Sequence, residues 1–183
     1  LVAGTSSSDT FWVVGHFPGI GNTKYLKLNT NDGESTATAA WNDTSPTNSA
    51  VSFGNSNVLN DNGYAHIIYS WHSVPGFSKI GTYTGTGDAD GTFVYTGFKP
   101  AWVMARRTGT ANWCVFDNAR NTTNPINGEL YADSSGSEDT SNNDIDFLSN
   151  GFKLRRGATN FNDSSTQIYM AFAEAPVNFS NAR

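Results

Sequence analysis

The stretch from Thr92 to Phe116 reads TFVYTGFKPAWVMARRTGTANWCVF, and it decides the fold class. It holds three short runs rich in aromatic and β-branched residues, separated by clusters that contain Gly with Thr, Lys or Pro. This is the pattern of strands joined by turns, and it predicts strands over 92–96, 101–106 and 112–116. Gly, Asn, Ser and Thr interrupt every window of helical length, so no amphipathic helix is expected.

The same alternation of short apolar runs and turn residues extends through the rest of the chain. Steps such as Asn62-Gly63 and Asp90-Gly91 supply the tight turns that hairpins need. Many short strands at this spacing predict an all-β, antiparallel β-sandwich or jelly roll. The further strands are expected near 10–15, 25–28, 50–53, 65–71, 79–84, 129–132, 152–155 and 167–174.

Composition limits the class of protein. The length of 183 residues favours a single domain, and the hydrophobic share of 37% allows a sizeable core. A net charge of −5 argues against nucleic-acid binding, which needs a basic face. No apolar run is long enough to span a membrane. The single cysteine, Cys114, excludes an internal disulfide, and its strand context indicates a small core residue.

An internal repeat relates the two halves of the chain. Phe11–Val14 matches Asn112–Val115, with Trp113 following Trp12 by 101 residues. We therefore expect one sandwich region over 1–183, made of a truncated first repeat (1–75) and a second repeat (76–183). The missing front of the first repeat indicates the C-terminal part of a longer chain. Two further matches pair 25–28 with 129–132 and 67–71 with 168–172.

Four stretches of the chain carry a more specific pattern: Trp71–Gly87, Phe93–Met104, Phe147–Leu154 and Tyr169–Glu174. They resemble a family of repeated β domains in bacteriophage structural proteins, above all those of marine phages. Trp41–Thr47 in the first copy is similar to the same family. The resemblance implies a concanavalin-like sandwich and a place on the virion surface, in a tail fibre or as a capsid decoration.

The resemblance implies no catalytic motif and no cofactor, so the expectation is a non-enzymatic virion structural protein. Its partners would be other virion proteins and further copies of itself, as a homo-oligomer, with a host-surface glycan as a possible adhesion target. The alternative is a carbohydrate-binding module of a secreted or particle-associated protein.

A glycoside hydrolase on this fold would need two carboxylates on one face, about 5–5.5 Å apart for a retaining mechanism. Glu129 and Asp133 are four residues apart, and Asp144 and Asp146 are two apart, so either pair could share a strand face. Neither reproduces the Glu-x-Asp-x-x-Glu pattern of laminarinase-type enzymes. The sequence therefore favours a protein without catalytic activity.

Trp41, Asn42 and Asp43 are the candidate ligand-binding residues. Trp41 lies among polar residues, and it serves either as an exposed platform for a sugar or as an anchor packed under its own loop. Asp88 and Asp90 resemble part of a calcium loop, but the segment lacks the terminal Glu of an EF-hand, so a tight turn is the stronger interpretation.

The other four tryptophans are expected in the core. Trp12 and Trp113 match in the repeat, and Trp71 and Trp102 match apolar residues. Because successive strand residues point to opposite faces, Cys114 should face away from Trp113.

Overall fold

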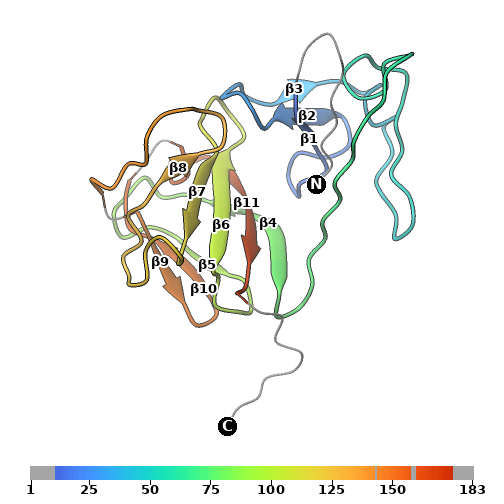
Figure 1. Ribbon diagram of the computed structural model, residues 1–183. Coiled ribbons are helices and arrows are strands. Elements are labelled where there is room, and N and C mark those ends of the chain that lie inside the picture. Colours follow the sequence, from blue (N-terminus) through green and yellow to red (C-terminus); the bar gives the residue numbers. More distant parts are fainter. Residues whose placement is uncertain (1–10, 143, 158–159, 175–183) are drawn as a thin grey trace.

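The computed structural model describes residues 11–142, 144–157 and 160–174, and within these it is all-β, without a helix (Figure 1). Every strand pairing is antiparallel. None of the described residues forms a helix that could cross a membrane. The strands are β1 (Val13–Val14), β2 (Lys24–Lys27), β3 (Ser35–Thr36), β4 (Ser78–Thr84), β5 (Phe93–Tyr95), β6 (Trp102–Arg107), β7 (Cys114–Asp117), β8 (Leu130–Tyr131), β9 (Ile145–Leu148), β10 (Gly151–Leu154) and β11 (Thr166–Phe172).

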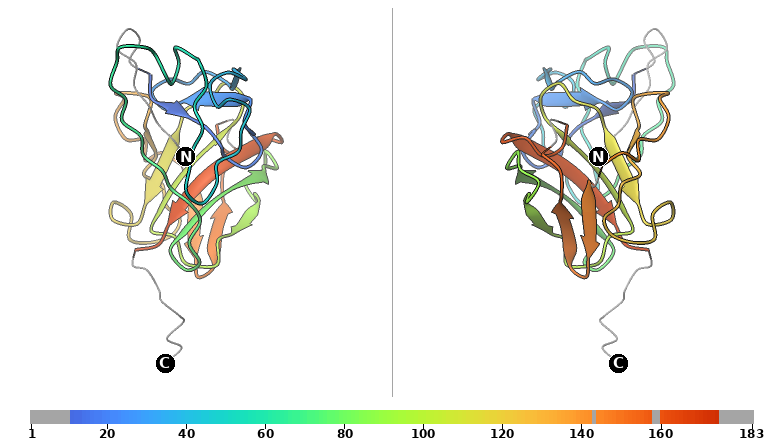
Figure 2. Two further views of the ribbon diagram at one scale, coloured as in Figure 1. Left: turned by 90° about the vertical axis from the view of Figure 1, so that its right-hand side faces the viewer. Right: turned by 90° about the vertical axis from the view of Figure 1, so that its left-hand side faces the viewer.

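A β-sandwich forms the larger part of the molecule. A five-stranded sheet, in the order β4-β11-β6-β7-β8, faces a three-stranded sheet in the order β5-β10-β9, and the two layers overlap in the side views of Figure 2. Between them lies a core that includes Phe116, Phe152, Phe161 and Tyr169. Alternate strand residues supply this core, so one face of each sheet is apolar as strand periodicity requires.

A third sheet, β1-β2-β3, covers part of the outer face of the five-stranded sheet. Val14, Phe17 and Leu26 from this region pack with Met104 and Ile168 of the sandwich. The stretches 1–75 and 76–183 thus contribute unequally: the sandwich consists of strands from the second stretch, and the first supplies the covering sheet.

Trp113 and Cys114 are both buried, but on opposite faces of the five-stranded sheet. Cys114 belongs to the core between the two sandwich layers, and Trp113 belongs to the core under the covering sheet. Burial raises the pKa of the Cys114 thiol. The expected alternation is therefore confirmed, and Cys114 is a core residue as predicted.

Arg106 ties the covering sheet to the sandwich. Its guanidinium is buried and donates to the carbonyl oxygens of Asp32 (2.7 Å) and Gly109 (2.8 Å). It also lies over the ring of Trp113, 4.9 Å from the centroid. The Trp113 indole in turn donates to the carbonyl of Lys27 at 2.7 Å. Loss of water around the guanidinium lowers the pKa of Arg106 to about 10.

Nine of the expected strands are present at or near their predicted positions, and two are not. Residues 50–53 and 65–71 form no strand, although their apolar character predicted one. Strands β3 and β9 were not predicted. A strand exists only where a second strand offers hydrogen bonds, and neither of the two missing strands has a ladder partner among the described residues.

Candidate functional site

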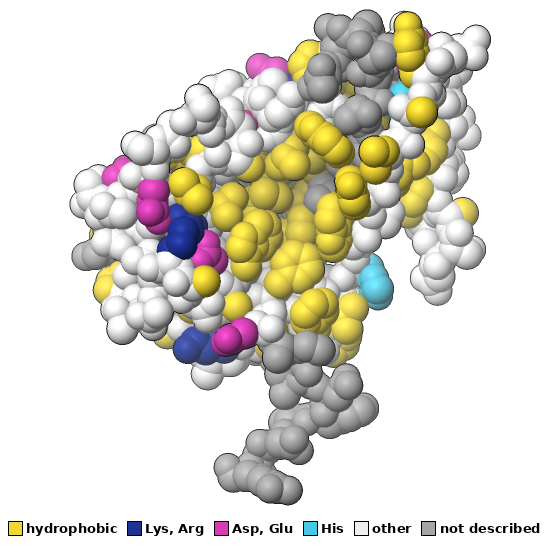
Figure 3. All heavy atoms as spheres, in the orientation of Figure 1, with side chains coloured by type: hydrophobic (Ala, Val, Ile, Leu, Met, Phe, Trp, Pro, Cys, Tyr) yellow, Lys and Arg dark blue, Asp and Glu magenta, His cyan; other side chains and the backbone are white. Residues whose placement is uncertain are grey.

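The most unusual surface feature is an exposed apolar segment, here named the 64–71 strip. It connects the covering sheet with β4 and exposes five large side chains, with Ile67 at 55% and Trp71 at 39% of full exposure. In Figure 3, hydrophobic side chains also gather on the face that β4, β11 and β6 present. Contiguous apolar surface of this kind marks an interaction site in a soluble protein. The five side chains are those of Tyr64, Ile67, Ile68, Tyr69 and Trp71.

Three aromatic rings form a row along this strip. The rings of Tyr69 and Trp71 stack at 5.8 Å with an interplanar angle of 23°. Trp12, at the start of the covering sheet, lies 6.3 Å from Tyr69. Tyr69 and Trp71 project from the same side of the extended backbone, because they are two residues apart. Such a row presents flat apolar faces next to polar groups.

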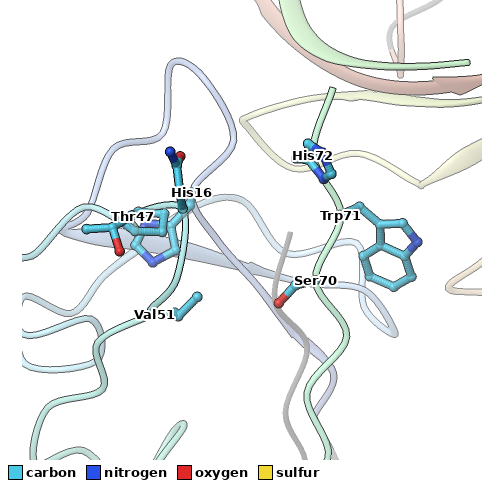
Figure 4. A pocket seen from close by; sticks show the side chains of 8 residues that line it. His16, Thr47, Val51, Ser70, Trp71 and His72 are labelled. Carbon is cyan, nitrogen blue, oxygen red and sulfur yellow. The ribbon is translucent and has the colours of Figure 1, made fainter. Parts of the chain in front are cut away.

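A cavity of about 440 Å³ adjoins the row. Figure 4 shows His16, Thr47 and Val51 on one side of it and the segment of Ser70 to His72 on the other. The Ser70 hydroxyl points toward Val51, whereas the Trp71 indole lies on the far side of its backbone and forms the rim. The described residues that line the cavity are His16, Pro46, Thr47, Asn48, Val51, Ser70, Trp71 and His72.

His16 is held in an unusual conformation at the wall of this cavity. Its backbone adopts a left-handed φ of 58°, which is uncommon for a non-glycine residue and costs energy. The imidazole packs against Trp41 at 4.4 Å, and its Nε2 atom is buried without a hydrogen-bond partner. Burial lowers the pKa of His16, so the ring is neutral at pH 7. A neutral imidazole has one donor and one acceptor nitrogen, and the buried Nε2 is not accessible to a ligand from solvent.

Trp41 is the anchor of its own loop. It is fully buried, and its indole nitrogen donates to the carbonyl of Lys24 at 2.9 Å. The adjacent Asn42 and Asp43 are exposed and adopt left-handed φ values of 51° and 44° in a turn. The three predicted ligand residues therefore do not converge: the indole faces inward, and the two polar side chains lie outside. Of the two interpretations left open by the sequence, the buried position fits the anchor.

Asp88 and Asp90 lie in an exposed turn. The Asp90 carboxylate accepts from the Lys153 ammonium at 2.7 Å, and this interaction lowers the pKa of Asp90. The backbone N–H of Asp88 donates to the Thr86 hydroxyl oxygen at 3.2 Å. Among the described residues, no group of three His, Cys, Asp or Glu side chains converges in a way that would hold a metal ion.

Two carboxylates that are distant in the sequence converge on Arg156. Glu129 and Asp144 are both buried, and their oxygens lie 3.3 Å and 3.0 Å from the same guanidinium nitrogen. The second oxygen of Glu129, Oε1, is buried, and the Glu129 carboxylate interacts with the side chains of Cys114 and Tyr131. The sequence spacing predicted other pairs, Glu129 with Asp133 and Asp144 with Asp146. Asp133 instead accepts from the Trp113 backbone, and Asp146 pairs with Arg155.

We expect Asp144 to make stability depend on pH. Burial raises its pKa to about 6, against the opposing effect of Arg156. The folded state therefore holds a proton that the unfolded chain releases, and this contribution to stability is lost as the pH rises from about 4 through 6. The Asn side chain does not titrate. The unfolding free energy of Asp144→Asn minus that of the wild type should therefore increase by up to about 3 kcal/mol as the pH rises from 4 to 7. Urea unfolding at both pH values measures this, and an unchanged difference would contradict it.

Sequence reasoning missed the strip because it assigned Trp71 to the core. The match between Trp71 and Phe172 is present in the sequence, but only Phe172 lies in a paired strand. Trp71 is substantially exposed, so the core prediction is wrong for it, and Trp12 and Trp102 are only half-buried. One signal was available: no charged residue occurs between Asn62 and Ser78.

Comparison with known proteins gives a family. No curated protein and no solved structure matches the chain. A family model matches residues 1–176, which is nearly the whole chain and includes the covering sheet, the 64–71 strip and the sandwich. The chain therefore belongs to the family described as a domain of unknown function, DUF7483.

Proposed function

We propose that this protein is a non-enzymatic structural protein of a bacteriophage virion, in a tail fibre or as a capsid decoration, where it contacts other virion proteins and further copies of itself. It would stand on the particle surface, where it also has access to a host-surface glycan. The observation that carries the proposal is the uncharged, exposed 64–71 strip on an all-β, charge-poor molecule. Such a surface suits contact with another macromolecule.

The arrangement of the buried carboxylates supports a structural role for them. Glu129 and Asp144 both form ion pairs with Arg156, and their side chains are almost fully buried. A glycosidase acid or nucleophile must reach the sugar at an open cleft. The 440 Å³ cavity is lined by none of these carboxylates.

Analysis of purified phage particles tests the proposal. Mass spectrometry should find the protein in particles that remain after density-gradient purification, in a fixed ratio to the major capsid protein. Antibody labelling in electron micrographs then assigns it to tail or capsid. Its absence from particles, with the protein present free in the lysate, would contradict the proposal.

We also propose that the sandwich is concanavalin-like, of the jelly-roll type, and that the covering sheet is a partial copy of it. The register supports a repeat. Val13 pairs with Lys27 in the β1–β2 pairing, and Cys114 pairs with Tyr131 in the β7–β8 pairing, which are the positions that the sequence match equates.

Hydrogen bonds around the two matched tryptophans agree with this. The Trp12 carbonyl accepts from Leu28 N at 2.7 Å, and the Trp113 carbonyl accepts from Ala132 N at 3.0 Å. The Trp12 N–H donates to the Asn29 side chain at 3.1 Å, and the Trp113 N–H to Asp133 at 3.0 Å. The two carbonyl bonds join positions that the sequence match makes equivalent, and Asn29 and Asp133 each lie one residue beyond the matched stretches.

A side-chain hydrogen bond of an asparagine repeats as well. The Asn60 side chain donates to the carbonyl six residues earlier, on Gly54, at 3.2 Å. The Asn162 side chain donates to the carbonyl six residues earlier, on Arg156, at 2.8 Å. Superposing an experimental structure of 11–61 on 112–163 tests the repeat, and unrelated positions for the two asparagines would contradict it.

The second candidate function is that of a carbohydrate-binding module. The stacked rings of Tyr69 and Trp71 beside a cavity of about 440 Å³ favour it, because sugars bind on exposed aromatic faces with hydrogen bonds from neighbouring polar groups. The described residues that line the cavity offer hydroxyl, amide and imidazole groups and include no Lys, Arg, Asp or Glu, which suits a neutral sugar.

For this candidate we expect Trp71→Ala to abolish glycan binding. Removal of the ring deletes the stacking surface, and the affinity should fall at least about tenfold, which corresponds to about 1.4 kcal/mol. A glycan array followed by calorimetry on the bound sugar measures this. Tyr95→Ala, on the exposed β5, is the matched control and should bind like the wild type. An array without any bound glycan would contradict this candidate.

A further inference from the structure

The 64–71 strip belongs to the outstretched segment that leads to β4 in Figure 1, and it has no strand partner among the described residues. Its sequence counterpart in the second half behaves differently. There, β11 is a central strand, paired along seven residues with β4 and along six with β6. The strip thus has the sequence of a central strand and lacks the neighbouring strands that β11 has.

We propose that the 64–71 strip is a dimer interface, in which it pairs antiparallel with the same segment of a second copy of this chain. This inference rests on the homo-oligomeric part of the proposed function and assigns it to named residues. Pairing of two identical strands about a two-fold axis is an isologous contact, the commonest kind in homo-oligomers. It would supply hydrogen bonds to one edge of each strip and cover its apolar side chains.

The charge pattern favours a second copy as the partner. The whole chain carries a net charge of −5, so two copies repel one another over most of their surfaces. Residues 62–78 contain no Lys, Arg, Asp or Glu, so this repulsion is weakest at the strip. Exposed strand edges of monomeric proteins normally carry a charge, especially Lys, to prevent such pairing. The strip has no such protection.

The side chains of the strip are complementary to themselves. A two-fold axis perpendicular to the paired strands, placed at Ile68, sets Ile68 opposite its own copy and Ile67 opposite Tyr69. It also sets Ala65 opposite Trp71, a small residue against a large one. Aromatic and β-branched pairs of this kind stabilise antiparallel strands. Ala65, Ile67, Tyr69 and Trp71 then form one continuous apolar face across both copies.

The neighbouring free edge is a poorer place for pairing. The outer edge of β4 is occupied by its own chain: Ser78 exchanges backbone hydrogen bonds with Val74, and the Ile80 N–H donates to the Ser73 hydroxyl at 3.0 Å. Farther along, the Thr84 carbonyl accepts from the Thr92 hydroxyl at 2.6 Å. Among the described residues, these contacts leave the strip as the unpaired edge next to β4.

Sedimentation velocity over a concentration series tests the interface with residues 1–183 as they are. We expect a reversible dimer, and Ile68→Lys should raise its dissociation constant about 100-fold, because two like charges would meet on the axis. Tyr95→Lys is the matched control, since Tyr95 is also an exposed aromatic residue on a strand, and it should dimerise like the wild type. A wild type that remains monomeric at 100 μM, or a dimer unaffected by Ile68→Lys, would overturn the inference.

Cross-linking tests the register and does not depend on the charged variant. Ile68→Cys should form a disulfide-linked dimer under mild oxidation, because residues opposite each other lie about 4.5–5.5 Å apart at Cβ. Tyr95→Cys should stay unlinked, and the native Cys114 is buried. Equal linking of both variants would overturn the inference.

Amide hydrogen exchange identifies other occupants of the strip. Protection of 65–71 should increase with protein concentration, whereas protection that is high at every concentration in a monomer would mean that the chain covers the strip itself and would overturn the inference. The outcome is separable from that of the particle analysis. A monomer found in virions refutes the dimer only, and a dimer absent from virions refutes the virion role only.

Discussion

Replacing Arg156 with methionine is expected to lower the free energy of unfolding by about 3 kcal/mol. The variant leaves Glu129 and Asp144 buried without their shared cation, and breaking a buried ion pair on one side typically costs about 3–5 kcal/mol. The lower end applies because the Arg156 side chain is one-third exposed, so water screens part of the interaction. Urea unfolding followed by tryptophan fluorescence measures the change.

Two further variants show whether the buried charges cause this loss. Adding Asp144→Asn to the Arg156→Met variant should recover part of the stability, since one uncompensated carboxylate is removed. Lys153→Met breaks the exposed pair with Asp90 and should cost clearly less than Arg156→Met, because water screens an exposed ion pair. Equal urea midpoints for Arg156→Met and Lys153→Met would contradict the argument.

Replacing Trp113 with alanine should cost about 3–5 kcal/mol and release the covering sheet. The side chain is 1% exposed, and its loss leaves a cavity between the sandwich and the covering sheet. The variant also removes the hydrogen bond to Lys27 and the ring under Arg106. Calorimetry measures the stability, and hydrogen exchange should show that β1 and β2 lose protection before the sandwich strands do.

The matched controls separate the roles of the tryptophan ring. Trp113→Phe keeps an aromatic ring and loses the indole hydrogen bond, so it should cost less than Trp113→Ala. Trp71→Ala removes an exposed indole and should change the unfolding free energy by less than about 1 kcal/mol. Similar losses for the alanine variants of Trp113 and Trp71 would show that the assignment of core and surface is wrong.

Strand periodicity explains why much of the fold could be predicted from the sequence. In the stretch 92–116, the alternation of apolar runs and turn residues places β5, β6 and β7 within one or two residues of their positions. The opposite orientation of Trp113 and Cys114 follows from the same geometry. These features depend on the local chain alone, and neighbouring residues specify them.

The candidate site was not predictable in the same way. Trp41 lies in polar surroundings in the sequence and Trp71 ends an apolar run, yet Trp41 is fully buried and Trp71 is exposed. The sequence match made Trp71 equivalent to the paired Phe172, but it could not say whether 65–71 would find strand partners. Burial depends on which distant segments meet, and a local pattern carries no information about that.

The sequence by itself determined the all-β class, the positions of most strands and the absence of charge between residues 62 and 78. Only the tertiary structure decided that Glu129 and Asp144 share Arg156, that Trp41 is an anchor and that the 64–71 strip pairs with no strand of the described part of the chain. The physical reason is that the alternation and the turn residues that favour strands are local properties of the chain, whereas strand partners, ion pairs, cavities and exposed edges arise from contacts between residues far apart in the sequence.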